Sequence, residues 1–114
     1  MKRDIAEKWV AALRSGKYKQ GRKALRTIDN EFCCLGVLCN LHALELPKIA
    51  AEQLNKCAYI GHRDYLPPSV RMWAGMNSQF GYIPGSSQSL SYDNDKGRSF
   101  DYIAERIDKH WQDL

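Results

Sequence analysis

Three of the four cysteines of this 114-residue chain lie within seven residues, in its most apolar stretch. The run extends from Phe32 to Cys39 and contains Cys33, Cys34 and Cys39. Thiols in such a run have three alternative roles, namely buried apolar side chains, metal ligands or a nucleophile. Because free cysteine is among the most buried residue types, burial in the core is the first expectation.

A metal site would need further ligands beside these cysteines. Cys39 and His42 are spaced i, i+3 on a predicted helix, and Cys34 or Cys57 could complete a tetrahedral set. However, the chain contains no Cys-x-x-Cys pair, which is the spacing typical of structural zinc sites. We therefore predict neither a metal nor any other cofactor.

A nucleophilic cysteine would need a lowered thiol pKa and a base nearby. If a helix begins at Cys33, its dipole and free amides would lower the pKa of the thiol of Cys33 or Cys34. Gln20 could then stabilise an oxyanion and His62 could act as the base, oriented by Asp64, as in papain-like cysteine peptidases. The flanking sequence typical of those peptidases is absent. A small cysteine hydrolase is therefore the alternative, and a protein that is not an enzyme is the expectation.

The basic residues of the chain are concentrated near its N-terminus. The net charge is only +4, but seven basic residues and no acid lie between Lys8 and Ile28. Cations that flank an aromatic ring suit a phosphate-bearing ligand, because arginine grips phosphate and the ring can stack on a base. The predicted ligand-binding residues are Arg14, Lys17, Tyr18, Lys19, Gln20, Arg22, Lys23 and Arg26. A solvated surface loop is the competing interpretation, since the segment matches no known nucleic-acid-binding motif.

The N-terminal half must position these groups with two helices and a loop. Apolar residues at helical spacing predict a helix over 4–15, with Asp4 as its N-cap and Gly16 after its end. The basic residues 17–23 read as a loop. Residues 24–28 and 31–32 could form a small hairpin around Asp29-Asn30.

A second helix is predicted from Cys33 to Leu46, and its apolar residues cover most of its circumference. Such a helix is normally buried. Glycine is unfavourable inside a helix, so Gly36 indicates that another part of the chain approaches closely there.

The C-terminal half is predicted to hold short elements, a long loop and one clear helix. We expect a helix near 48–57, a short strand at Tyr59-Ile60 and a helix beginning at Pro67-Pro68. The loop over 76–98 could contain a second hairpin through residues 82–83 and 90–92. A final helix follows Ser99, its predicted N-cap.

Together these elements predict one α+β domain over residues 1–114, mostly helical, with one or two short antiparallel hairpins around a buried central helix. We expect the first and last helices to pack on that central helix through a set of large apolar side chains, Trp9, Leu13, Phe100, Ile103 and Ile107. No apolar run is long enough to span a bilayer and no signal peptide is evident, which favours the cytoplasm and free thiols.

The sequence also resembles a group of small proteins of tailed bacteriophages. The resemblance covers nearly the whole chain, and Cys-Cys-Leu-Gly-Val-Leu at 33–38 is its most specific motif. The residues that carry it are Trp9-Val10, 13–21, Phe32 through Cys39, Tyr65-Leu66-Pro67, and Asn94-Asp95 with Phe100, Ile103 and Ala104. The group is described as having no known function. The resemblance therefore implies a phage protein in the cytoplasm of a bacterial host, and no catalytic residues.

The leading functional hypothesis is a non-enzymatic accessory protein that binds an anionic ligand or a host factor. A nucleotide-like signal or a nucleic acid would supply the anion for the basic segment. The alternatives are the cysteine hydrolase and a protein-binding inhibitor of a host enzyme. A homodimer is also considered, because three tryptophans in so small a chain could leave aromatic surface to cover.

Overall fold

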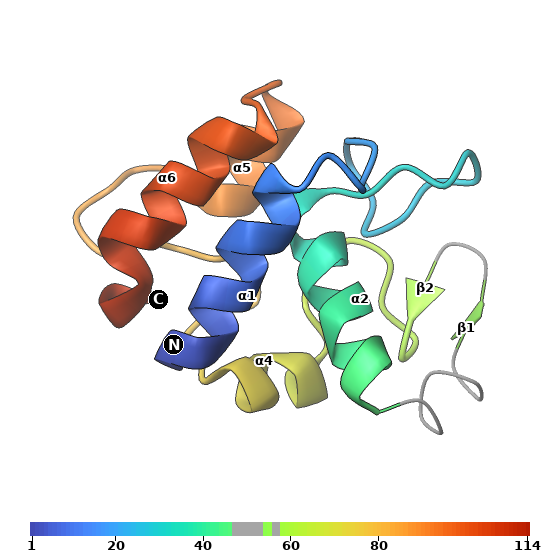
Figure 1. Cartoon of the computed structure of the whole chain (residues 1–114), viewed down its shortest axis with the longest axis horizontal. Coiled ribbons are helices and arrows are strands. Elements are labelled where there is room, and N and C mark those ends of the chain that lie inside the picture. The colour runs from blue at the N-terminus through green and yellow to red at the C-terminus, as the bar shows by residue number, and fades with distance from the viewer. Residues whose placement is uncertain (47–53, 56–57) are drawn as a thin grey trace.

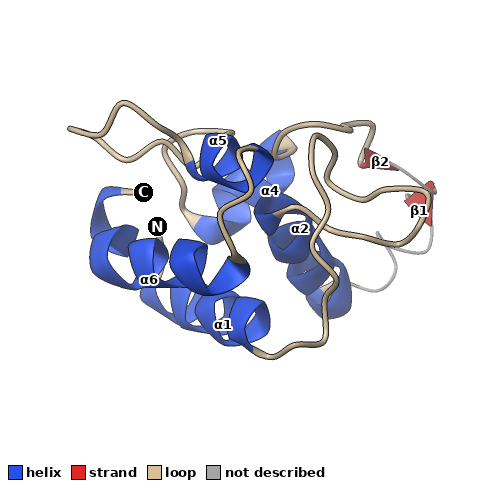
Figure 2. Cartoon of the chain, turned by 90° about the horizontal axis from the view of Figure 1, so that it is seen from above, coloured by secondary structure: helices blue, strands red, loops and turns tan. Residues whose placement is uncertain are grey.

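The computed structural model describes residues 1–46, 54–55 and 58–114. Its elements are α1 (Arg3–Arg14), α2 (Cys34–Glu45), β1 (Leu54–Asn55), β2 (Ala58–Tyr59), α4 (Pro68–Ala74), α5 (Leu90–Asp95), α6 (Phe100–His110) and the 3-10 helix η1 (Trp111–Asp113). The two strands pair antiparallel, with Leu54 opposite Tyr59, and Figure 2 shows this pair at the edge of the molecule. The prediction of a single, mostly helical domain is therefore confirmed.

Helix α1 lies between α6 and α2 (Figure 1). It packs mainly against α6, and it contacts α2 over a smaller area. Helix α6 lies chiefly on α1 and also contacts α5. Its Ile103 and Ile107 belong to the same buried cluster as Leu35 of α2, so the side chains expected to pack together do share one core. The two chain ends meet beside these helices, where the amino group of Met1 donates to the carbonyl oxygen of Trp111 at 3.2 Å.

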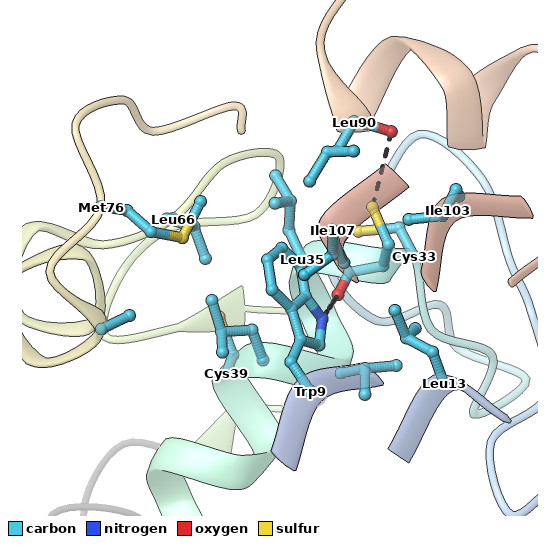
Figure 3. Packing of buried hydrophobic residues seen from close by; sticks show 14 of the residues in the cluster. Trp9, Leu13, Cys33, Leu35, Cys39, Leu66, Met76, Leu90, Ile103 and Ile107 are labelled. Carbon is cyan, nitrogen blue, oxygen red and sulfur yellow. Dashed lines mark hydrogen bonds between the residues drawn. The ribbon is translucent and has the colours of Figure 1, made fainter. Parts of the chain in front are cut away.

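Helix α2 forms the centre of the core, as its all-round apolar surface predicted. Leu35, Val37 and Leu38 have no exposed surface. The indole Nε1 of Trp9 in α1 donates to the carbonyl oxygen of Cys34 at 2.9 Å, which joins the two helices inside the core (Figure 3). Trp9 is itself fully buried, so this hydrogen bond satisfies the one polar atom of its ring.

Local sequence signals set most of the helix ends. The hydroxyl of Ser99 accepts a hydrogen bond from the amide of Tyr102, which makes Ser99 the N-cap of α6 as predicted. Gly16 follows α1 with a φ of 74°, in the left-handed region that glycine tolerates best. Asp4, in contrast, lies inside the first turn of α1, because Lys2 occupies the N-cap position.

Neither hairpin predicted from the sequence forms as expected. The first is reduced to an isolated bridge between Arg26 and Phe32, because the amide of Leu25 donates instead to the carbonyl oxygen of Arg63. The second is reduced to a bridge between Tyr82 and Ser89. Residues 90–92 are not a strand, because the side chain of Ser89 caps α5 and starts a helix there.

The helix expected near 48–57 is contradicted where the structure can test it. Residues 54–55 of that range form the strand β1. The other residues of the range, 48–53 and 56–57, lie outside the described residues.

Candidate functional site

The three clustered cysteines are core residues in this structure. Cys33 is the N-cap of α2, and its sulfur accepts a hydrogen bond from the amide of Gly36 at 3.3 Å. Burial nevertheless raises the pKa of the Cys33 thiol to about 11, and burial also raises the pKa values of Cys34 and Cys39. Thiols with raised pKa values are poor nucleophiles at neutral pH, so the helix start does not activate them here.

The proposed catalytic partners of these thiols make other contacts. The side-chain amide of Gln20 donates to Asn94 Oδ1 at 2.9 Å and to the carbonyl oxygen of Arg98 at 2.8 Å. The ring of His62 packs edge-on against Tyr65, with ring centres 5.0 Å apart. Among the described residues, the side chains of His62 and Asp64 share no hydrogen bond.

The metal interpretation gains no support from the described part of the chain. Within residues 1–46 and 58–114, no three histidine, cysteine or acidic side chains gather into a group that could hold a metal ion. His42 Nδ1 lies 2.6 Å from the hydroxyl of Tyr59, so that ring nitrogen is occupied by a buried hydrogen bond. Cys57, one of the proposed ligands, lies outside the described residues.

Asn94 in α5 connects the basic segment to the core. Its Oδ1 accepts hydrogen bonds from Gln20 and from the amide of Cys34, at 2.9 and 3.1 Å. Its Nδ2 donates to the carbonyl oxygen of Gly21 at 2.8 Å. Because Asn94 is fully buried, these bonds hold residues 20–21 firmly against the start of α2 and the last turn of α5.

The basic segment divides when the chain folds, and part of it meets residues 95–98. The amide of Lys23 donates to Asp95 Oδ1 at 2.8 Å. The guanidinium of Arg22 lies against Gly97, where an added Cβ would come within 2.7 Å of Nη2. These contacts bring Arg22 and Lys23 beside Lys96 and Arg98, although about 75 residues separate the two pairs along the sequence.

The second pair of cations, Lys96 and Arg98, lies over the rings of two exposed tyrosines. The ammonium of Lys96 lies 5.5 Å from the centre of the Tyr92 ring, and the guanidinium of Arg98 lies 4.8 Å from that of Tyr102. Tyr92 is 43% exposed and Tyr102 is 40% exposed. We call the group formed by Arg22, Lys23, Lys96, Arg98, Tyr92 and Tyr102 the cationic surface.

One acid lies within this surface, because the carboxylate of Asp95 accepts the hydrogen bond from the amide of Lys23 and offsets part of the charge. The nearest buried acid, Asp93, has a partner of its own. The carboxylate of Asp93 is buried and forms an ion pair with Arg106 of α6. Arg106 also donates to the hydroxyl of Ser86 at 3.1 Å, which fixes the guanidinium. The pair joins α5 to α6 and leaves its own charges balanced.

The other predicted ligand-binding residues lie elsewhere or have partners. Lys19 forms an ion pair with Glu31 at 3.5 Å. Tyr18 and Arg26 both contact the Phe32 ring and not residues 95–98, with Tyr18 edge-on and Arg26 above it. Arg14 and Lys17 are exposed near the end of α1.

Sequence reasoning missed four members of the cationic surface. Lys96 and Arg98 flank a glycine and stand between two tyrosines, which is itself a pattern of cations and aromatic rings. That pattern lies in a region predicted as a loop and far from the basic segment. The hydrogen bonds of Asn94 and Asp95, which unite the two regions, leave no local signal in the sequence.

The chain was also compared with known proteins. Residues 1–111 match a protein family described as Domain of unknown function (DUF8296). No curated protein and no solved structure gives a significant match. No helix among the described residues is long and apolar enough to cross a membrane. The origin in tailed bacteriophages implied by the sequence resemblance stays a prediction.

Proposed function

The chain belongs to the DUF8296 family, whose function is unknown, and from its surface we propose that it is a non-enzymatic binder of a phosphate-bearing ligand. A nucleotide and a single-stranded nucleic acid share the chemistry that fits, which is a phosphate attached to a flat base. The cationic surface is the proposed binding site.

The observation that best supports this proposal is that the fold brings two basic pairs, Arg22-Lys23 and Lys96/Arg98, together from distant parts of the chain. Like charges held side by side repel one another, so their assembly favours a site for an anion. Lys23 adopts a left-handed backbone conformation with a φ of 63°, which the hydrogen bond from its amide to Asp95 supports. Such conformations cluster at functional sites, because surrounding contacts must hold them in place.

Tyr92 and Tyr102 supply a second element of recognition. Each ring is partly exposed and carries a cation, Lys96 or Arg98. A base can stack on an exposed ring while the neighbouring cation contacts its phosphate, the combination found in proteins that bind single strands. This arrangement favours a nucleotide or nucleic acid over a simple inorganic anion.

The setting of this activity follows from the sequence resemblance. We place the protein among the accessory proteins that a phage makes in the cytoplasm of a bacterial host, where nucleotides and nucleic acids are abundant. A host protein and a second copy of the chain remain candidate partners. The cysteine hydrolase is less favoured, because its thiols are buried with raised pKa values. The inhibitor of a host enzyme stays an alternative.

The proposal is tested by fluorescence polarisation with two labelled probes, an oligothymidine of about 20 nucleotides and a mononucleotide. We expect wild-type protein to bind one probe or both at low salt. The double variant Arg22→Glu/Lys23→Glu should weaken binding at least about a hundredfold, because it removes two phosphate contacts and adds two repulsive charges. The probe that binds more tightly identifies the source of the phosphate.

A matched control is provided by Lys2 and Arg3, another adjacent and exposed basic pair. The variant Lys2→Glu/Arg3→Glu changes the net charge by the same amount, but both residues lie outside the cationic surface. It should therefore retain nearly all of the binding. A separate Arg98→Gln variant should lower the slope of log affinity against log salt by about 0.7, the value for one single-strand phosphate contact. Absence of binding to both probes, or equal losses in the two double variants, would overturn the proposal.

A further inference from the structure

Three aromatic rings that the cationic surface does not include pack against one another. The ring of Tyr65 lies edge-on to His62, with ring centres 5.0 Å apart, and its centre is 5.7 Å from that of the Phe80 ring. Phe80 is 41% exposed, although its side chain has no polar atom for water to bind. An exposed apolar ring that its neighbours hold in place is suited to stacking. We call these three residues the aromatic cluster.

The loop that contains His62 and Tyr65 is bonded to the chain that leaves the cationic surface. The amide of Leu25, two residues after Lys23, donates to the carbonyl oxygen of Arg63 at 2.7 Å. Arg63 is exposed, but so is the acid that follows it, and this loop therefore adds a cation without adding net charge. The positive charge that an anion would meet here comes from the cationic surface.

A second connection joins the aromatic cluster to α5. The amide of Ser91 donates to the carbonyl oxygen of Phe80 at 3.2 Å. The next residue is Tyr92, whose ring lies under the ammonium of Lys96 in the cationic surface. The aromatic cluster and the cationic surface therefore adjoin at two places, and both connections are hydrogen bonds of the backbone.

We propose that the phosphate-bearing ligand is a single strand of nucleic acid that runs from the cationic surface onto the aromatic cluster, where one of its bases stacks on Phe80. This inference rests on the proposed function and selects the strand over the mononucleotide. The one base of a mononucleotide is accommodated by Tyr92 or Tyr102, so only a longer ligand also reaches Phe80. A duplex keeps its bases paired and stacked inside, whereas a single strand presents them to exposed rings.

The length of the bound strand is tested with three probes in fluorescence polarisation, namely a thymidine mononucleotide, an oligothymidine of about 12 nucleotides and a duplex of the same length. We expect the single strand to bind at least about tenfold more tightly than either of the other probes. A longer strand also brings more phosphates to the cationic surface, so length alone does not identify the role of the aromatic cluster.

Variants of Phe80 separate stacking from charge. Phe80→Leu keeps an apolar side chain but removes the ring, so it should weaken binding of the strand at least about fivefold, the lower limit for one stacked base. Phe80→Trp provides a flat ring again and should bind the strand at least as tightly as wild type. Neither variant should change binding of the mononucleotide. Leu44→Ala removes another exposed apolar side chain, on α2, and should leave both affinities unchanged.

The possible results distinguish this inference from the proposed function. A loss in Phe80→Leu that Phe80→Trp does not recover would attribute the effect to packing and overturn the stacking role. Equal binding of strand and mononucleotide, or unchanged strand binding in Phe80→Leu, would also overturn the inference. If Arg22→Glu/Lys23→Glu still lost binding in either case, the proposed function would stand and the cationic surface alone would be the site. Absence of binding to every probe would overturn both.

Discussion

The carbonyl oxygen of Leu25 lies against Gly36 so closely that a Cβ at residue 36 would come within 1.7 Å of it. The same oxygen accepts a hydrogen bond from the amide of Cys33 at 3.3 Å. The loop that leaves the basic segment is therefore seated directly on the first turn of α2. Any side chain at residue 36 would have to move this backbone, because a carbonyl oxygen cannot rotate away as a side chain can.

We predict that Gly36→Ala lowers the free energy of unfolding by about 3 kcal/mol, although alanine is the better helix former by about 1 kcal/mol. The loss arises because the Leu25 backbone must withdraw from α2, and the core around it must open. Urea denaturation followed by circular dichroism measures the change. Gly16→Ala is the matched control, because Gly16 has open space around it and only its left-handed φ opposes the substitution.

The control variant should lose only about 1 kcal/mol, the penalty of a left-handed alanine. If Gly36→Ala loses no more than Gly16→Ala, the close approach of Leu25 does not constrain the fold. If both lose little, residues 15–25 are more adaptable than the structure indicates.

Asn94 is predicted to be the most important polar residue for stability. Asn94→Ala leaves the amide of Cys34 and the carbonyl oxygen of Gly21 without partners in a buried site. Each buried and unsatisfied group costs roughly 1–3 kcal/mol, so we expect a total loss of about 3 kcal/mol. Gln112→Ala, at an exposed position, should change stability by less than about 0.5 kcal/mol. A similar result for both variants in urea denaturation would contradict this role.

The buried thiols are predicted to be unreactive in the folded protein. We expect iodoacetamide to leave Cys33, Cys34 and Cys39 unlabelled at neutral pH and to label all three in urea, as read by mass spectrometry. A Cys57→Ser background restricts the readout to these three thiols. Rapid labelling of Cys33 or Cys34 in the folded state would contradict the raised pKa values and would favour the alternative function, a cysteine hydrolase.

Features encoded within a few residues of one another could be predicted from the sequence. The last helix was found from Ser99 and from apolar residues at helical spacing, and both signals are local. The burial of α2 followed from its all-round apolar composition, and Gly36 correctly indicated a close neighbour. The identity of that neighbour, Leu25, depends on the path of the loop, which no local pattern records.

Features created by distant partners could not be predicted in this way. Asp93 and Asn94 look like loop residues by type, yet they are buried in a helix because Arg106 and the backbone of Gly21 and Cys34 satisfy them. The basic segment itself was visible as a charge pattern. The position of the basic segment beside Lys96 and Arg98 depends on contacts between residues more than seventy positions apart in the sequence.

The buried pair of His42 and Tyr59 predicts a pH-dependent stability. Burial lowers the pKa of His42 below its usual value of 6.5, although the nearby charge of Glu45 opposes the shift. His42 is surrounded by the Tyr59 hydroxyl at 2.6 Å and by the Trp73 ring, whose centre lies 5.1 Å away. Neither of these neighbours offers a negative charge to an imidazolium, since burial raises the pKa of Tyr59 to about 12.

The direction of the effect follows from which state binds more protons. Because the pKa of folded His42 lies below 6.5, the unfolded chain binds more protons than the folded chain as the pH falls through 6.5, so the free energy of unfolding falls as the pH is lowered. We expect a slope of up to about 1.4 kcal/mol per pH unit as the pH falls below 6.5, measured by urea denaturation. His42→Gln should remove this slope, whereas Tyr59→Phe should keep most of it, because burial and not the hydrogen bond is the main cause. A wild-type slope that survives in His42→Gln would assign the effect to another group.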